Sequence, residues 1–227
     1  MGIEFTVVSL GTLSSNPFWN EPGGVRTPHA TTTLVRDADR VILVDPSLPS
    51  PAIEARLLER TGLKPEAITY VFCTTLRPTH RRGLGAFSAA RWTCAAAELD
   101  AYRETLDGLD AEAGTDDADI ARAVAAERDL IDRFQAAPDK LTDAVHLFPL
   151  PGPSTGSAGL LLAGPRQTVI VAGDAAVTID HVLAGRAWSG AANPAAAVQS
   201  LTDLLEIANL IVCGHDNYMP SPTRWMS

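Results

Sequence analysis

The sequence contains little lysine and carries no excess of positive charge. Only two of its 18 basic residues are lysines, and 27 acidic residues give the chain a formal net charge of −9. Non-specific binding to nucleic acid or to an anionic membrane requires a basic surface. We therefore expect neither nucleic acid nor a membrane among the partners of this protein.

Cysteines are also scarce, and long apolar runs are missing. Cys73, Cys94 and Cys213 are too few and too widely spaced for a disulfide framework, and each lies in an apolar run, which favours buried, reduced thiols. The sequence has no run of about 18 apolar residues that could cross a bilayer, and it begins with a strand pattern instead of a basic segment and an apolar signal core. These features predict a cytoplasmic protein.

The 227 residues are enough for one domain with a full core, and no repeat, linker or low-complexity tract divides them. Short apolar runs predict β-strands at residues 4–10, 31–35, 41–45, 68–73, 91–95, 145–150, 159–162, 168–172 and 210–213. Helical spacing predicts helices at 50–61 and 193–207, and two or three more in an insertion at 96–136, with breaks near Gly108 and 114–117. The mixture is typical of an α/β protein with two packed sheets, but periodicity alone does not select that layout.

A polar turn after the strand predicted at 68–73 carries the most specific motif. It contains Thr75, Arg77, Thr79 and His80, and a helix is expected to follow. This strand, turn and helix resemble the metallo-β-lactamase superfamily, in which the strand end carries His-x-His-x-Asp-His. On that pattern the four residues occupy ligand positions, and only His80 keeps the residue of the family.

Three later segments resemble the remaining landmarks of that superfamily in the same order. The turn Pro-Gly-Pro-Ser-Thr-Gly-Ser at 151–157 matches a family turn in which a histidine stands where this chain has Pro153. Two strands then end in Gly-Asp and Gly-His, which supply Asp174 and His215. The resemblance extends from the first strand to His215. It implies an αββα sandwich of two mixed β-sheets flanked by helices, with the site along one edge of the sheets.

The resemblance also implies which metal ligands are lost. Positions for the first metal hold Thr75, Arg77 and Pro153, so that site is abolished. Positions for the second metal hold Thr79, which replaces an aspartate, together with retained His80, His215 and the bridging carboxylate of Asp174. Two histidines and one carboxylate suffice for a single divalent metal, either zinc or iron.

Two functions of different kinds follow from this half-site. In the first, the protein is a mononuclear metal-dependent hydrolase that acts on a small anionic or carbonyl-containing molecule, with Asp174 in the catalytic site and Arg77 stabilising negative charge. In the second, it is a metal-free, non-catalytic binding or interaction protein in which Arg77 pairs with Asp174. A nuclease is disfavoured by the negative charge and by the loss of the two-metal geometry.

Residues around the half-site are candidates for contact with a small-molecule ligand. The predicted substrate-binding residues are Phe18, Trp19, Thr75, Thr79 and His181. The two aromatic residues lie on a long loop at 11–30, where ligand contact and packing onto the protein's own surface are equally plausible. A surface or helix-cap histidine is the alternative for His181. Asp45 matches a family carboxylate that supports the motif loop, and the insertion at 96–136 could cover the site or form a homodimer face.

Overall fold

Two mixed β-sheets form the centre of the molecule. A computed structural model describes residues 2–113 and 118–224, and within them the first sheet contains, in spatial order, β1 (Glu4–Ser9), β2 (Thr32–Asp37), β3 (Arg40–Val44), β4 (Tyr70–Phe72), β5 (Arg91–Cys94) and β6 (Gln135–Ala136). The second sheet contains β11 (Tyr218–Pro220), β10 (Leu210–Cys213), β9 (Thr168–Gly173), β8 (Ala158–Ala163) and β7 (Val145–Pro149). In the first sheet β1 to β3 are antiparallel and β3 to β6 are parallel, and in the second only β9 and β10 are parallel. The predicted pair of mixed sheets is confirmed.

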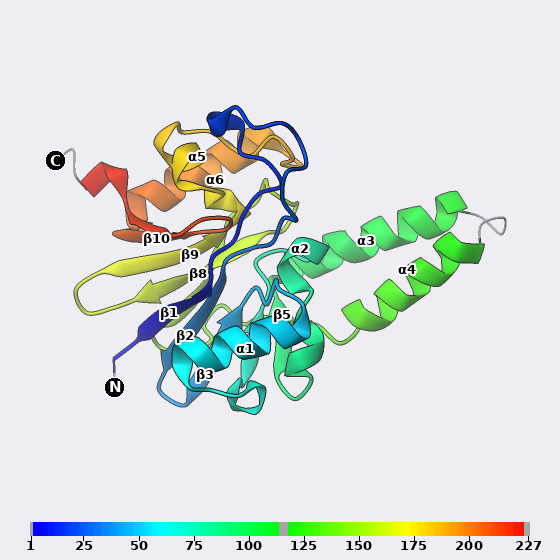
Figure 1. The fold of residues 1–227 in the computed structure, drawn as a ribbon, viewed down its shortest axis with the longest axis horizontal. Helices are drawn as coiled ribbons and strands as arrows, with labels where there is room; N and C mark the ends of the chain where they lie inside the picture. Colours follow the sequence, from blue (N-terminus) through cyan, green and yellow to red (C-terminus); the bar gives the residue numbers. More distant parts are fainter. Residues whose placement is uncertain (1, 114–117, 225–227) are drawn as a thin grey trace.

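Helices cover the outer faces of both sheets (Figure 1). They are α1 (Ser50–Thr61), α2 (Pro78–Arg81), α3 (Ala96–Ala113), α4 (Ala118–Ile131), α5 (Ile179–Leu183) and α6 (Pro194–Ile207), with short 3-10 turns at Pro17–Trp19, Pro65–Ala67, Leu84–Phe87, Asp174–Ala176 and Pro222–Arg224. Figure 1 shows α1 against the first sheet, α5 and α6 against the second, and α3 and α4 as a hairpin that projects from one end. Among the described residues, no helix is both long and apolar enough to cross a membrane.

Strand residues alternate between two hydrophobic layers, because successive side chains of a strand point to opposite faces. On β2, Leu34 packs toward α1 with Leu57, whereas the next residue, Val35, packs between the sheets with Val171 of β9. A third cluster lies between the second sheet and α6 and includes Leu204. One buried layer therefore lies between the two sheets, and one lies between each sheet and its outer helices, as an αββα sandwich requires.

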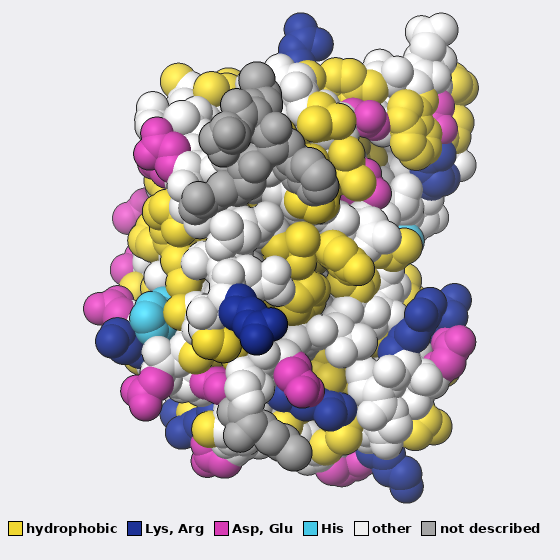
Figure 2. Space-filling view, turned by 90° about the vertical axis from the view of Figure 1, so that its left-hand side faces the viewer, with side chains coloured by type: hydrophobic (Ala, Val, Ile, Leu, Met, Phe, Trp, Pro, Cys, Tyr) yellow, Lys and Arg dark blue, Asp and Glu magenta, His cyan; other side chains and the backbone are white. Residues whose placement is uncertain are grey.

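The face opposite the α3–α4 hairpin carries charges of both signs (Figure 2). Acidic and basic side chains are interspersed on this face, and the basic ones do not gather into one patch. Apolar side chains lie in the middle of the same face. The described residues of this face thus form no continuous basic track for a nucleic-acid backbone.

Two local predictions differ from the structure or lie beyond it, and two short strands were missed. The break expected near Gly108 is wrong, because α3 continues through it. A single helical glycine costs only about 1 kcal/mol relative to alanine, and buried Leu106 anchors this part of α3. The strands β6 and β11 were not predicted, since segments of two and three residues are too short to show a period. The break at 114–117 lies outside the described residues.

Candidate metal centre and its surroundings

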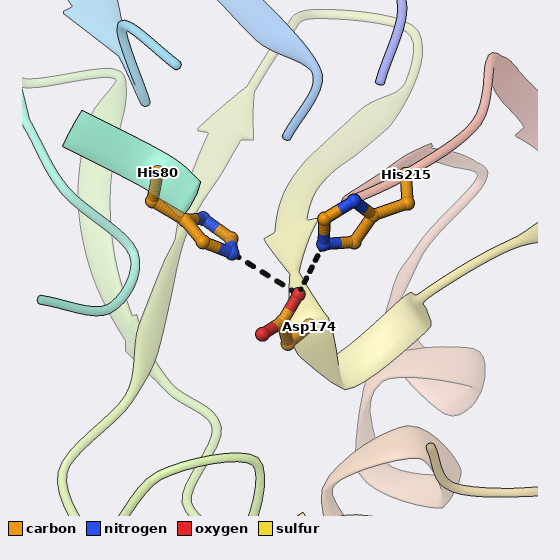
Figure 3. A group of neighbouring side chains, drawn as sticks. All are labelled: His80, Asp174 and His215. Carbon is orange, nitrogen blue, oxygen red and sulfur yellow. Dashed lines mark hydrogen bonds and ion pairs between the residues drawn. The ribbon is translucent and has the colours of Figure 1, made fainter. Parts of the chain in front are cut away.

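Three side chains that are far apart in the sequence meet at one edge of the two sheets (Figure 3). His80 Nε2 lies 3.2 Å from Asp174 Oδ1, and His215 Nε2 lies 3.0 Å from the same oxygen. The three ligand atoms all lie within 4.8 Å of one another, and all three residues are buried. Figure 3 shows the two imidazole rings approaching the carboxylate from opposite sides.

The local fold explains why these residues meet. The strands β9 and β10 are parallel neighbours, so the residues that follow them, Asp174 and His215, emerge at the same sheet edge. At the end of β9, Gly173 adopts a φ of +53°, and an added Cβ would lie 2.4 Å from Thr74 Oγ1. Only glycine fits this combination of positive φ and close approach. His80 lies on α2 directly across from them, so the motif turn supplies the third member.

The outward-facing nitrogen of each histidine meets hydrogen-bond acceptors. Nδ1 of His80 lies 3.0 Å from Asp45 Oδ2. Nδ1 of His215 lies 3.1 Å from the carbonyl oxygen of Thr12 and 2.9 Å from that of His29. These contacts favour a ring proton on Nδ1, and with that proton alone each ring would direct the Nε2 lone pair at the carboxylate of Asp174. A cation or an added proton is needed between these groups, since lone pairs and a carboxylate repel one another.

This donor set fits one divalent metal ion. Ligand bonds of about 2.0–2.1 Å in a tetrahedral site place neighbouring ligand atoms roughly 3.3 Å apart. The two distances from Asp174 Oδ1, 3.2 and 3.0 Å, are close to that separation. Two imidazole nitrogens and one carboxylate suit zinc or iron(II) and leave coordination positions open.

Asp45 supports the motif turn from behind. Its carboxylate accepts hydrogen bonds from the backbone N of Thr74 at 2.8 Å and from the hydroxyl of Thr74 at 2.6 Å. One of its oxygens, Oδ2, also faces His80. Asp45 thus fixes both the start of the turn and the orientation of the His80 ring, a role in keeping with the expectation from the sequence.

Electrostatics in the metal-free site favour a charged pair. Burial alone lowers the pKa of His80, but the carboxylates of Asp174 and Asp45 outweigh burial and raise that pKa to about 10. For Asp174, burial raises the pKa, and the charge of His80 together with the hydrogen bonds from His215 and His80 brings it well below its ordinary value. Without a metal, protonated His80 therefore supplies the positive charge that the carboxylate needs.

Arg77 occupies the other side of the same carboxylate. Its Nη1 lies 3.3 Å from Asp174 Oδ2, while Nη2 donates to the carbonyl oxygens of Pro153 and of Gly190, the latter at 3.1 Å. The guanidinium also lies over the ring of Trp188, 4.6 Å from its centroid. The ion pair between Arg77 and Asp174 that the sequence suggests is present in the structure.

Comparison with known proteins decides the family. A sequence model described as the Metallo-beta-lactamase superfamily matches residues 26–215. The chain belongs to this superfamily. No curated protein matches the sequence significantly.

Solved structures of metallo-β-lactamase-like proteins share the fold. A putative metallo-beta-lactamase from Thermotoga maritima aligns with a TM-score of 0.68 and 18% identity, over 97% of this chain and 100% of its own. AidC, a dizinc quorum-quenching lactonase in complex with a product, aligns with a TM-score of 0.64 and 14% identity, over 85% of this chain and 73% of its own. An N-acyl homoserine lactone hydrolase with N-hexanoyl-L-homoserine at its catalytic metal centre aligns with a TM-score of 0.62 and 19% identity, over 95% and 93%. At these identities the similarity shows the fold alone.

Two threonines at superfamily ligand positions do not join the cluster of His80, Asp174 and His215. Thr75 is buried, and its hydroxyl donates to Glu98 Oε1 at 2.7 Å, which does not favour the predicted contact with substrate. Thr79 is half-buried, and its carbonyl oxygen accepts from the backbone N of Ala30 at 3.2 Å. Sequence reasoning missed Glu98, because nothing near it in the chain distinguishes a buried helical glutamate from an exposed one.

The predicted aromatic loop lies beside the centre. Phe18 packs edge-to-face on His181, with ring centroids 4.9 Å apart, and Asn16 Nδ2 donates to Asp180 Oδ2 at 2.9 Å. His181 is buried, its Nδ1 is 2.7 Å from the hydroxyl of Thr178, and burial lowers its pKa. Trp19 is 59% exposed and only partly covered by a neighbouring arginine.

Phe18 and His181 also line a pocket of about 410 Å³. Trp188 also lines this pocket. Because the guanidinium of Arg77 lies over the Trp188 ring, the pocket is next to the cluster of His80, Asp174 and His215. Sequence reasoning missed Trp188, which is in a loop without a recognisable pattern. The other lining residues are Pro17, Gly185, Arg186, Ala187, Ser189, Pro194 and Val198.

Proposed function

We propose that this protein binds one divalent metal ion at His80, Asp174 and His215 and acts as a hydrolase on a small anionic or carbonyl-containing molecule. The observation that carries the proposal is the convergence of two Nε2 atoms on Asp174 Oδ1 while both outward nitrogens meet acceptors. When bound at such a site, a divalent metal polarises a carbonyl or phosphoryl oxygen and activates water.

The residues of the chain have separate tasks in this proposal. Asp174 directs Oδ1 toward the histidines and Oδ2 toward Arg77, so one carboxylate serves both halves of the centre. Arg77 is held in place by backbone carbonyls, yet its side chain is 25% exposed and remains accessible to a ligand. A fixed guanidinium next to the reacting group binds an anionic substrate and stabilises negative charge that develops on an oxygen.

The neighbouring pocket supports a substrate with an apolar portion. Its walls include Phe18, Trp188 and Val198, which offer apolar surface, and Arg186 adds a cation to the lining. Two structurally similar proteins are described as binding N-hexanoyl-L-homoserine, a molecule with an acyl chain and a carboxylate. This similarity supports esters and lactones of medium-length acids as the first compounds to examine.

A second function is favoured by the ion pair of Arg77 with Asp174. With His80 protonated and Arg77 on the opposite oxygen, the carboxylate is neutralised without any metal. The alternative proposal is therefore a metal-free protein that binds a small molecule without catalysis. A single domain, a cytoplasmic location and a homodimer stay predictions, and gel filtration with light scattering tests the last of these.

An activity assay on protein reloaded with zinc, iron(II) or manganese separates the two functions. The substrates are p-nitrophenyl acetate, p-nitrophenyl hexanoate and N-hexanoyl homoserine lactone. We expect turnover that requires metal, that favours the hexanoyl compounds and that disappears in His215→Ala but persists in His146→Ala, a matched change on β7. If every metal fails to bind to the folded protein, the hydrolase proposal is wrong and the metal-free function is favoured.

A further inference from the structure

Glu98 is a buried carboxylate with hydrogen-bond donors from two separate loops. It lies in the first turn of α3 and is 3% exposed. Oε1 accepts from the hydroxyl of Thr75 at 2.7 Å and from the backbone N of Leu76 at 2.8 Å. Oε2 accepts from the hydroxyl of Ser154 at 2.6 Å and from the backbone N of Gly156 at 3.3 Å. Each oxygen therefore serves one loop.

Arg77 joins the same two loops a second time. It directly follows Leu76 in the chain, and its guanidinium donates to the carbonyl oxygen of Pro153, which directly precedes Ser154. These contacts form a closed ring. It runs from Glu98 to the motif turn, through Arg77 to the loop at 151–157, and from that loop back to Glu98. The two segments also touch directly, through Ser154 Oγ and Thr75 Oγ1 at 3.2 Å and through the backbone N of Ala158, which donates to the carbonyl oxygen of Thr74 at 3.0 Å. Together with these contacts, Glu98 sets the separation that Arg77 must span.

The loop at 151–157 is closely seated on the start of α3. An added Cβ on Gly156 would lie 2.1 Å from the backbone of Ala97 and of Glu98, so no larger residue fits there. A buried carboxylate without partners is costly, whereas this one has four donors. Burial, close packing and full pairing together make Glu98 a fixed point for both loops.

The two loops that Glu98 connects carry all three positions at which the superfamily pattern places ligands of the first metal. Those positions hold Thr75, Arg77 and Pro153 in this chain. We propose that Glu98 replaces the lost metal as the cross-link between the loops and is a positioning residue that holds Arg77 against Asp174. The inference rests on the proposed role of Arg77, but it concerns the metal-free protein and does not depend on turnover.

Chemical modification of arginines tests the positioning directly. In Glu98→Gln the amide nitrogen cannot accept a hydrogen bond, so one loop loses its hydrogen bonds to residue 98. Phenylglyoxal labelling of the metal-free, full-length protein, read by peptide mass spectrometry, should show Arg77 reacting at least about fivefold faster. Arg26, whose side chain is 33% exposed, is the internal reference and should keep its rate. Glu104→Gln, an exposed change on the same helix, should leave both rates unaltered.

The pattern of rates distinguishes positioning from general loosening. Equal acceleration at Arg77 and Arg26 would mean that Glu98 only stabilises the fold, and an unchanged rate at Arg77 would mean that Glu98 does not hold it. Either result overturns the proposal. If Glu98→Gln does not fold, Ser154→Ala removes a single donor from the same ring and is read in the same way.

A double-mutant cycle gives a second, independent measurement. Among the described residues, no hydrogen bond or ion pair joins the side chains of Glu98 and Arg77 directly, so the coupling that hydrogen bonds carry between them passes through the two loops. We expect the loss of melting temperature in Glu98→Gln with Arg77→Gln to be smaller than the sum of the single losses. The control pair, Glu104→Gln with Arg77→Gln, should be additive. Additivity in the first pair would contradict the ring. None of these readouts involves metal or substrate, so their failure is distinguishable from failure of the proposed hydrolase.

Discussion

The two sides of Asp174 differ in how they match the superfamily pattern. We call the side with His80 and His215, which match that pattern, the kept side, and the side with Arg77 at a ligand position the rebuilt side. On the kept side, Oδ1 faces His80 and His215, which are buried and whose Nε2 atoms converge as metal ligands do. On the rebuilt side, Oδ2 faces Arg77, a cation attached to the chain. The comparison shows that the buried carboxylate needs positive charge on both sides. On one side an arginine can supply the positive charge that a metal ion supplies in a two-metal centre.

The two sides also differ in what holds them. The histidines are oriented by Asp45 and by backbone carbonyls, which is the arrangement that supports metal ligands. Arg77 is held by carbonyl oxygens and by the ring of Trp188, and these groups suit a guanidinium better than a zinc or iron ion. Variants can therefore break one side while the other stays intact.

The largest effect should come from Asp174→Ala, which removes the group that both sides share. Loss of a buried partner leaves His80 and Arg77 without their common counter-charge, and such losses cost about 3–5 kcal/mol. We expect this destabilisation in urea unfolding of the metal-free protein, together with complete loss of bound metal. Asp129→Ala, an exposed change on α4, is the control. A variant that unfolds like the wild type would show that the carboxylate does not neutralise the two sides.

Metal affinity should depend strongly on pH because a proton and the metal compete for His80. Its pKa in the metal-free protein is raised from 6.5 to about 10, so metal binding in this range displaces one proton. Affinity should rise about tenfold per pH unit between pH 7 and pH 9. Calorimetric titration with zinc in buffers of different protonation enthalpy measures both the affinity and the proton release. An affinity that does not change with pH would contradict the charged pair of His80 and Asp174.

The same pKa fixes the sign of the stability change in the metal-free protein. A raised pKa means that protonated His80 stabilises the fold fully below about pH 6.5 and that this contribution is lost as pH rises through about 10. The lowered pKa of Asp174 acts in the opposite direction, and its contribution is lost on acidification below the ordinary value of 3.8. Urea midpoints should therefore decline toward alkaline pH without metal and stay level with zinc bound.

A smaller effect is expected from Asp45→Asn, which alters the support behind His80. Residues that orient a metal ligand typically contribute about 10- to 100-fold to metal affinity. We expect a loss in that range with one metal per chain retained at saturation. The control is Asp39→Asn in the exposed turn between β2 and β3. An affinity equal to the wild type would mean that Asp45 supports only the turn.

Arg77→Gln should have the smallest effect on stability and none on metal stoichiometry. The side chain is 25% exposed, so loss of its ion pair should cost about 1 kcal/mol. One metal per chain should still bind, because the ligands of the kept side do not include Arg77. Elemental analysis and urea unfolding measure the two quantities. We expect no second metal ion, because Thr75 and Pro153 offer no ligand group of the superfamily kind. Binding of a second metal ion would show that Arg77 alone excludes it.

The sequence predicted the kept side better than the rebuilt one. Asp174 and His215 follow strand ends with recognisable neighbours, so the fold brings them together wherever these strands are adjacent and parallel. The pairing of Arg77 was also foreseeable, since a cation at a lost ligand position needs a carboxylate. Glu98 and Trp188 were not foreseeable, because their contacts join loops about 20 to more than 100 residues apart and leave no local period. Thr75 illustrates the same limit, since its hydroxyl turns to Glu98 instead of toward a ligand.

A crystal structure of the zinc-loaded protein, with anomalous scattering recorded at the zinc edge, tests the central claim most directly. The account predicts one zinc ion per chain, about 2.0–2.2 Å from Nε2 of His80, Nε2 of His215 and a carboxylate oxygen of Asp174, with the guanidinium of Arg77 still on the other oxygen. Two zinc ions with Arg77 displaced, or no zinc between the histidines, would contradict it.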